Sequence, residues 1–140
     1  MPEYSKTVAG LTICSLLKFK IMVTAADHQA LLADCKQWLE NLRQHKEMIN
    51  GLRSELYTAA AGKTDKEFLK EVEHYHNQFH IQQINIHDLK HEIRHHIAEA
   101  EHHPNFGHRI PHHNIELQYN SLIGDIDKLA DDFHLFVGGK

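Results

Sequence analysis

The chain has 140 residues, of which 41% are hydrophobic and 24% are charged, values that are usual for one globular domain. Its formal net charge is -4 with every histidine counted as neutral, and its basic and acidic residues are interleaved, which argues against nucleic-acid binding. No apolar run reaches the roughly 18 residues that a membrane-spanning helix needs. The 2 cysteines form no disulfide framework, so we expect a cytoplasmic protein.

The amino-terminal segment over residues 1–23 lacks a regular helical pattern, and we expect it to be irregular or weakly ordered. The pattern changes abruptly after Met22, so two interpretations stay open. Either translation begins at Met22 rather than at Met1, or the segment is native and packs on the domain. The folded domain is expected over residues 24–137.

A long amphipathic helix is predicted over about residues 25–61, with Thr24 as its N-cap and Gly62 as its stop. Its apolar side follows the alternating 3 and 4 spacing of a helix face: Leu31, Cys35, Trp38, Leu42, His45, Ile49, Leu52, Leu56 and Ala59. Residues 64–67 read Thr-Asp-Lys-Glu, a capping box that starts the next helix. The short connection predicts an antiparallel hairpin that pairs about a point between residues 62 and 63.

A second helix is expected over about residues 65–103 and a third over about residues 112–136. The row of residues that faces inward along a helix is called its seam. The seam of the second helix is Phe68, Val72, Tyr75, Phe79, Gln82, Ile86, Leu89, Ile93, His96 and Ala100. The seam of the third is Ile115, Tyr119, Leu122, Ile126, Leu129, Phe133 and Phe136. Further apolar residues widen the seams, which favours an all-α three-helix bundle with coiled-coil-like heptad packing over a two-stranded coiled coil.

The third helix is the shortest, so we expect it to leave the tip of the hairpin uncovered. Folding back about residue 107 sets Phe136 opposite Phe79. The hairpin tip is defined here as Met48, Ile49, Leu52, Leu56, Phe68, Leu69, Val72 and Tyr75. An exposed apolar patch usually marks an interface, so we predict a homodimer formed by two tips. The alternative is that each tip packs on itself with partial exposure.

Histidine is the most unusual residue of the chain, since 12 of its 15 histidines lie between His74 and His113. Six of them fall on one helix arc of about 100°, and this set is called the histidine stripe: His76, His80, His87, His91, His95 and His102. Imidazole binds zinc, nickel and copper and titrates near neutral pH. Three interpretations stay open: a weak surface metal site at His87, His91 and His95, a pH-sensitive assembly, or a simple solvated face.

Residues 91–95 read His-Glu-Ile-Arg-His and match the zinc-protease motif His-Glu-x-x-His. The match lies inside a histidine-dense run, and Ile93 on the seam turns His91 and His95 away from the core. The longer form of the motif also fails, because Ala98 and Glu101 stand where it needs glycine and histidine. We therefore expect no enzyme of this class.

A second candidate metal site lies at the end of the bundle remote from the tip. Hairpin pairing sets His28 near His96 or Glu99, and the third helix brings His112 and Glu116 to the same level. Seam histidines need hydrogen-bond partners, and imidazoles with carboxylates can hold a metal in a bundle core. A hydrated bundle end is the alternative interpretation.

Halfway along the bundle, His45 and Gln82 are expected at one level, where buried polar groups would fix the helix register.

Taken together, the sequence favours a non-enzymatic bundle that acts by self-association or by binding another protein. The alternative is a histidine-rich protein that binds or buffers zinc, nickel or copper. No membrane association is expected.

Overall fold

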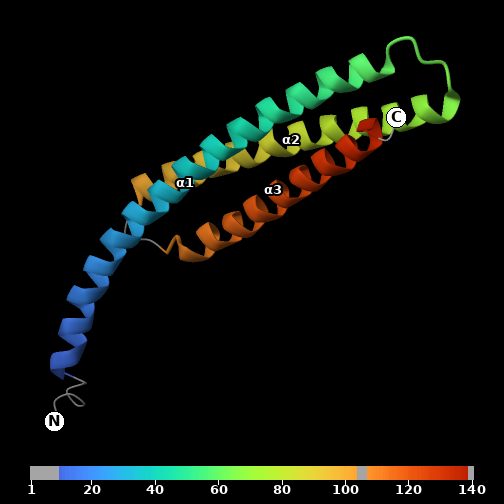
Figure 1. The fold of residues 1–140 in the computed structure, drawn as a ribbon. Coiled ribbons are helices and arrows are strands. Elements are labelled where there is room, and N and C mark those ends of the chain that lie inside the picture. The colour runs from blue at the N-terminus through green and yellow to red at the C-terminus, as the bar shows by residue number, and fades with distance from the viewer. Residues whose placement is uncertain (1–9, 104–106, 139–140) are drawn as a thin grey trace.

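The structure is a computed structural model that describes the backbone of residues 10–103 and 107–138 and, within the first helix, side chains from His28 onward. It contains three helices: α1 Gly10–Ala60, α2 Lys66–His102 and α3 Arg109–Gly138. The predicted all-α class and three-helix bundle are confirmed. Figure 1 shows the helices side by side, with the amino-terminal part of α1 running on beyond the ends of α2 and α3. None of the helices in the described ranges is long and apolar enough to cross a membrane.

The predicted seams form the core of the bundle because their spacing keeps apolar side chains on the inward face of each helix. Nine large side chains are almost completely buried: Phe79, Phe133, Leu42, Ile49, Leu56, Ile86, Ile93, Ile126 and Cys35. Burying one such aliphatic or aromatic side chain contributes about 1.5–3 kcal/mol. His45, Gln82, Leu129 and Phe136 lie on the seams but are only partly buried.

Aromatic rings join α3 to the hairpin tip. Phe133 meets Phe79 edge to face at 5.2 Å, and Phe136 stacks on both Phe68 and Tyr75 at 5.1 Å. The prediction that Phe136 lies opposite Phe79 is therefore wrong by about one turn, since Phe133 takes that place. The cause is that α3 begins before residue 112 and ends after residue 136.

The hairpin tip is consequently covered within one chain. Five of its members are buried: Ile49, Leu52, Leu56, Phe68 and Tyr75. Met48 and Val72 are partly buried, and Leu69 is 37% exposed. The expectation of an uncovered tip was wrong, because α3 extends over it. The homodimer itself stays a prediction.

The connection between α1 and α2 sets the register of the hairpin. Gly62 ends α1 with a positive φ of 75°, as predicted, but the N-cap of α2 is Asp65 rather than Thr64. Its carboxylate accepts a hydrogen bond from the backbone N–H of Phe68 at 3.2 Å. The connecting residues run outward, so that α2 begins beyond the end of α1 (Figure 1). The connection is thus less tight than predicted.

The observed register differs from the prediction by about two helical turns. Pairing between residues 62 and 63 would set Asn50 level with Tyr75, whereas Asn50 accepts a hydrogen bond from Gln83 Nε2 at 2.6 Å. Arg53 also bonds Gln83, at 2.6 Å. Each level of α1 therefore meets residues of α2 that lie further along the chain than predicted.

The start of α1 also differs from the prediction. The helix is continuous from Gly10, so Thr24 lies inside it and is not an N-cap. Residues 10–23 are helical rather than irregular, and residues 1–9 lie outside the described part of the chain.

Substitution of Phe79 by alanine tests the aromatic core. The ring is fully buried against Phe133 and Tyr75, so we expect Phe79→Ala to lower the free energy of unfolding by about 3–5 kcal/mol. Leu135→Ala is the control, because Leu135 is 75% exposed on α3, and its cost should stay below about 1 kcal/mol. Urea denaturation measures both, and equal losses would contradict the described packing.

Candidate metal centre

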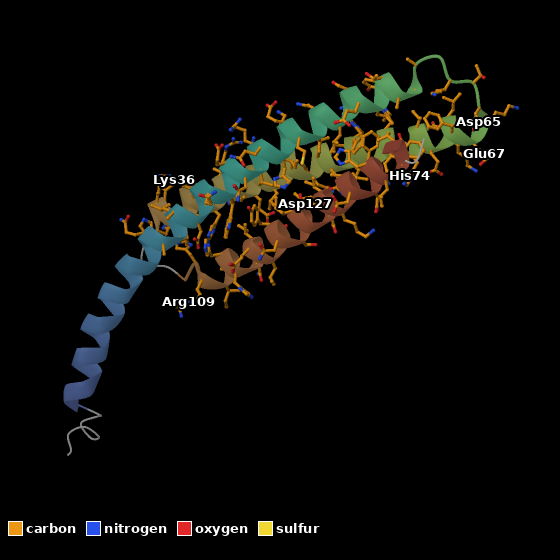
Figure 2. The ribbon with its side chains drawn as sticks, viewed as in Figure 1. Lys36, Asp65, Glu67, His74, Arg109 and Asp127 are labelled. Carbon is orange, nitrogen blue, oxygen red and sulfur yellow. The ribbon has the colours of Figure 1, made fainter. Side chains whose placement is uncertain are left out.

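One residue from each helix contributes to a cluster at the end of the bundle remote from the tip. Cys35 of α1, His96 of α2 and His112 of α3 each offer one donor atom, and the three atoms lie within 4.8 Å of one another. This set is called the Cys35–His96–His112 cluster. Figure 2 labels Lys36, which follows Cys35 in sequence, and Arg109, the first residue of α3, at the same end, whereas Asp65 and Glu67 mark the opposite end.

Helix periodicity explains why these side chains meet. Cys35 lies between Leu31 and Trp38 on the seam of α1, and His96 follows Ile93 by three residues on the seam of α2. His112 lies three residues before Ile115 and so shares its inward face at the start of α3. Cys35 is completely buried, His96 is 5% exposed, and the His112 side chain is 16% exposed.

Hydrogen bonds link the two imidazoles to a carboxylate of α1. His96 Nε2 lies 3.1 Å from His112 Nδ1, and His112 Nε2 lies 3.1 Å from Asp34 Oδ2. An ionised carboxylate only accepts hydrogen bonds, so His112 donates from Nε2. With both rings neutral, His112 Nδ1 then accepts the hydrogen bond that His96 Nε2 donates. Asp34 therefore fixes the tautomer of both rings.

Aromatic stacking holds the His112 ring in place. Trp38 stacks on one side at 4.7 Å between ring centroids, and His96 stacks on it at 5.2 Å. Trp38 in turn stacks on Tyr119, whose hydroxyl accepts a hydrogen bond from Asn41 Nδ2 at 2.6 Å. The ring is thus fixed by packing and by hydrogen bonds at both nitrogens.

Burial keeps the inner members of the cluster neutral. It lowers the pKa of His96 from 6.5 to about 4, with further lowering from the nearby imidazoles of His112, His108 and His95. Burial also raises the pKa of the Cys35 thiol from 9.0 to about 12, and the adjacent Asp34 carboxylate adds to the rise. A neutral imidazole binds a metal through its unprotonated nitrogen, and in His112 that nitrogen is Nδ1. The proton on His96 Nε2 would have to move to Nδ1 before Nε2 could bind, and the Cys35 thiol becomes a ligand when a metal displaces its proton.

The donor set suits a borderline metal ion. Thiolate and imidazole are the usual ligands of zinc, and a tetrahedral zinc ion with bonds of roughly 2.0–2.1 Å to two imidazoles separates their nitrogens by about 3.3 Å. The two nitrogens of the cluster lie 3.1 Å apart, close to that separation. Asp34 bonds the outer nitrogen of His112, which is how carboxylates orient metal-bound histidines.

Only part of the predicted bundle-end site is brought together. His96 and His112 meet as predicted, whereas His28, Glu99 and Glu116 are not in the cluster. The two-turn register difference places Cys35, rather than His28, at the level of His96. Glu99 is exposed, and Glu116 pairs instead with His113, at 3.6 Å.

The predicted surface residues lie where the periodicity placed them. His87, His91 and His95 are exposed on α2, and Glu92 of the protease-like motif is exposed beside them. His87 Nδ1 contacts Asp88 Oδ1 at 3.4 Å.

The predicted polar layer of His45 and Gln82 takes another form. His45 instead joins Asn41 O at 2.9 Å and Asp127 Oδ1 of α3 at 3.1 Å. Gln82 Oε1 accepts a hydrogen bond from Asn85 of its own helix at 3.2 Å. The histidine therefore links α1 to α3 rather than to α2.

Sequence reasoning missed Cys35, Asp34 and Trp38. Cys35 was assigned to the core on its seam position, which is correct, but the predicted register set it away from His96. Two signals were available in the sequence. One is the position of Cys35 on the seam, and the other is that Asp34 and Trp38, on either side of it, are four residues apart and so lie on one helix face. Neither signal identifies the partner histidines without the correct register.

Comparisons with protein-family models, with curated proteins and with solved structures give no match for this chain.

The low pKa of His96 predicts a specific loss of stability in acid for the metal-free protein. In the folded state the ring stays neutral down to about pH 4, while in the unfolded chain it binds a proton near pH 6.5. The unfolded state thus binds more protons between these values, and the free energy of unfolding falls as pH falls through them, by up to about 3 kcal/mol.

Urea denaturation at several pH values measures this effect. A His96→Leu variant removes the titrating group, so its stability should fall less steeply than that of the wild type between pH 6.5 and 4. His91→Leu is the matched control, because His91 is exposed on the same helix and is not among the imidazoles that lower the pKa of His96, and it should keep the wild-type slope. Parallel curves for wild type and His96→Leu would contradict the assignment.

Proposed function

We propose that this protein binds one divalent transition-metal ion, with zinc preferred, through Cys35, His96 and His112. The single observation that carries the proposal is that three donor atoms from three different helices lie within 4.8 Å of one another. Unlike a pair of histidines on one helix, this set joins elements that are far apart in sequence. Binding would therefore stabilise the packing of α3 on the α1–α2 hairpin.

Charge and burial support the proposal. A thiolate at Cys35 and the Asp34 carboxylate beside His112 together balance the two positive charges of the ion. Cys35 and His96 are buried, so water is excluded from these two ligands. This strengthens the electrostatic attraction between the ligands and the ion. The role is binding and stabilisation, and no catalytic step is proposed.

Zinc titration of the tag-free protein tests the proposal. A ligand that binds only the folded state at a hundredfold excess over its dissociation constant stabilises that state by about 2.7 kcal/mol, so we expect the melting temperature to rise. Cys35→Ala should lose this rise, while Cys14→Ala, which removes the other cysteine, should keep it.

Cobalt gives a second readout, since cobalt bound to a thiolate has a charge-transfer absorption that imidazole-only surface sites lack. We expect this absorption in the wild type and in Cys14→Ala but not in Cys35→Ala. No rise in melting temperature at hundredfold excess of zinc, together with no thiolate absorption, would overturn the proposal.

A second candidate function is self-association, favoured by apolar side chains on the outer face of α2. Ile81 and Ile84 are each 45% exposed and lie three residues apart, so they share one face of the helix. Pairing of two chains over this face, beside the hairpin tip, would cover them.

Sedimentation equilibrium at micromolar concentration tests this candidate. We expect a dimer that the double variant Ile81→Gln, Ile84→Gln converts to a monomer. The control is Leu135→Gln, since Leu135 is 75% exposed on α3, and it should stay dimeric. A monomeric wild type would contradict self-association.

A further inference from the structure

We infer that His108 is the fourth ligand of the metal ion bound by the Cys35–His96–His112 cluster, an inference that rests on the proposed function. His108 immediately precedes α3, and its backbone carbonyl accepts the hydrogen bond from the His112 N–H at 2.9 Å. The two histidines are therefore four residues apart on one turn. Side chains at this spacing lie on the same face of a helix, the usual arrangement for two histidines that bind one metal.

The His108 ring already lies next to the cluster. Its centroid is 6.1 Å from that of His96, with the two rings edge to face. Two imidazoles bound to one tetrahedral zinc ion have centroids roughly 5 Å apart, given the usual zinc–nitrogen bond lengths. The His96 and His112 rings meet that value at 5.2 Å, and the His108 centroid lies about 1 Å further from that of His96 than this value.

Hydrogen bonding leaves the correct nitrogen of His108 available. Its Nε2 lies 2.6 Å from the backbone carbonyl oxygen of His103, which can only accept, so Nε2 carries a proton. In the neutral ring the lone pair is then on Nδ1. His112 has the same arrangement, because Asp34 holds its Nε2 and leaves Nδ1 toward His96. A carbonyl on the outer nitrogen orients a metal-bound histidine as a carboxylate does.

Coordination chemistry gives a reason for a fourth ligand. Structural zinc sites are four-coordinate and closed, and the cluster supplies three protein ligands. His108 is half-buried and immediately precedes the helix that carries His112, so it completes the set without a change in the fold. The metal would then hold the start of α3 at two positions one turn apart.

Cobalt spectroscopy of the full-length chain in a Cys14→Ala background tests the assignment. We expect the parent to show thiolate charge transfer together with the intense visible bands of four-coordinate cobalt. His108→Ala should keep the thiolate absorption, change the position and intensity of the visible bands because water replaces an imidazole, and bind cobalt roughly a hundredfold more weakly. Added imidazole should restore the visible bands, because the position of His108 is partly open to solvent.

His113→Ala is the matched control, since His113 is an exposed neighbour that pairs with Glu116. It should match the parent in spectrum and affinity. An unchanged spectrum and affinity in His108→Ala would overturn the inference while leaving the three-ligand proposal in place. Absence of thiolate charge transfer in the parent would instead overturn the proposed function, and with it this inference.

Discussion

The register between α1 and α2 is the constraint on which the rest of the structure depends. An antiparallel hairpin pairs residues at a constant sum of positions, so a change at its connection shifts every level along its length. Here Asp65 rather than Thr64 caps α2, and α2 begins beyond the end of α1. The polar contacts of Asn50 and Arg53 with Gln83 follow from this shift, and so does the meeting of Cys35 with His96.

Polar groups are then buried where the register places them, and each is accommodated by a partner. His96 lies at a core position that an apolar residue would fill at a lower cost in free energy. Its pKa of about 4 reflects the free energy needed to place a charged imidazole at that buried site. Its ring nitrogen is satisfied by His112, which is satisfied by Asp34. Removing either outer member would leave a buried imidazole without its partner, which costs more than the bond itself contributes.

The core could be predicted from the sequence because helix periodicity determines which side chains face inward. Leu42, Ile86 and Ile126 were assigned to their seams on spacing alone, and all three are fully buried. Helix ends were less predictable. Thr64 and Asp65 are both good N-caps, and the sequence does not distinguish them, whereas in the structure Asp65 caps the turn that holds Phe68 against Phe136 of α3.

The site was only half predictable for the same reason. His96 and His112 were correctly paired because the fold-back of α3 about the second connection was nearly right. Cys35 was missed because its level depends on the first connection, where the predicted register was wrong. Spacing within one helix is a local property, whereas a site formed by three helices requires two independent registers.

Packing separates two kinds of histidine that composition alone cannot distinguish. The pairs formed by His87, His91 and His95 offer two exposed imidazoles each, so a metal bound there would also have to order side chains that no core packing holds. In the cluster, Trp38 and Asp34 have already fixed the His112 ring, and its Nδ1 lies 3.1 Å from His96 Nε2. In the proposed metal site, folding would therefore supply that ordering before an ion binds. The affinity of that site would then depend on a few buried residues, although most of the histidines lie on the surface.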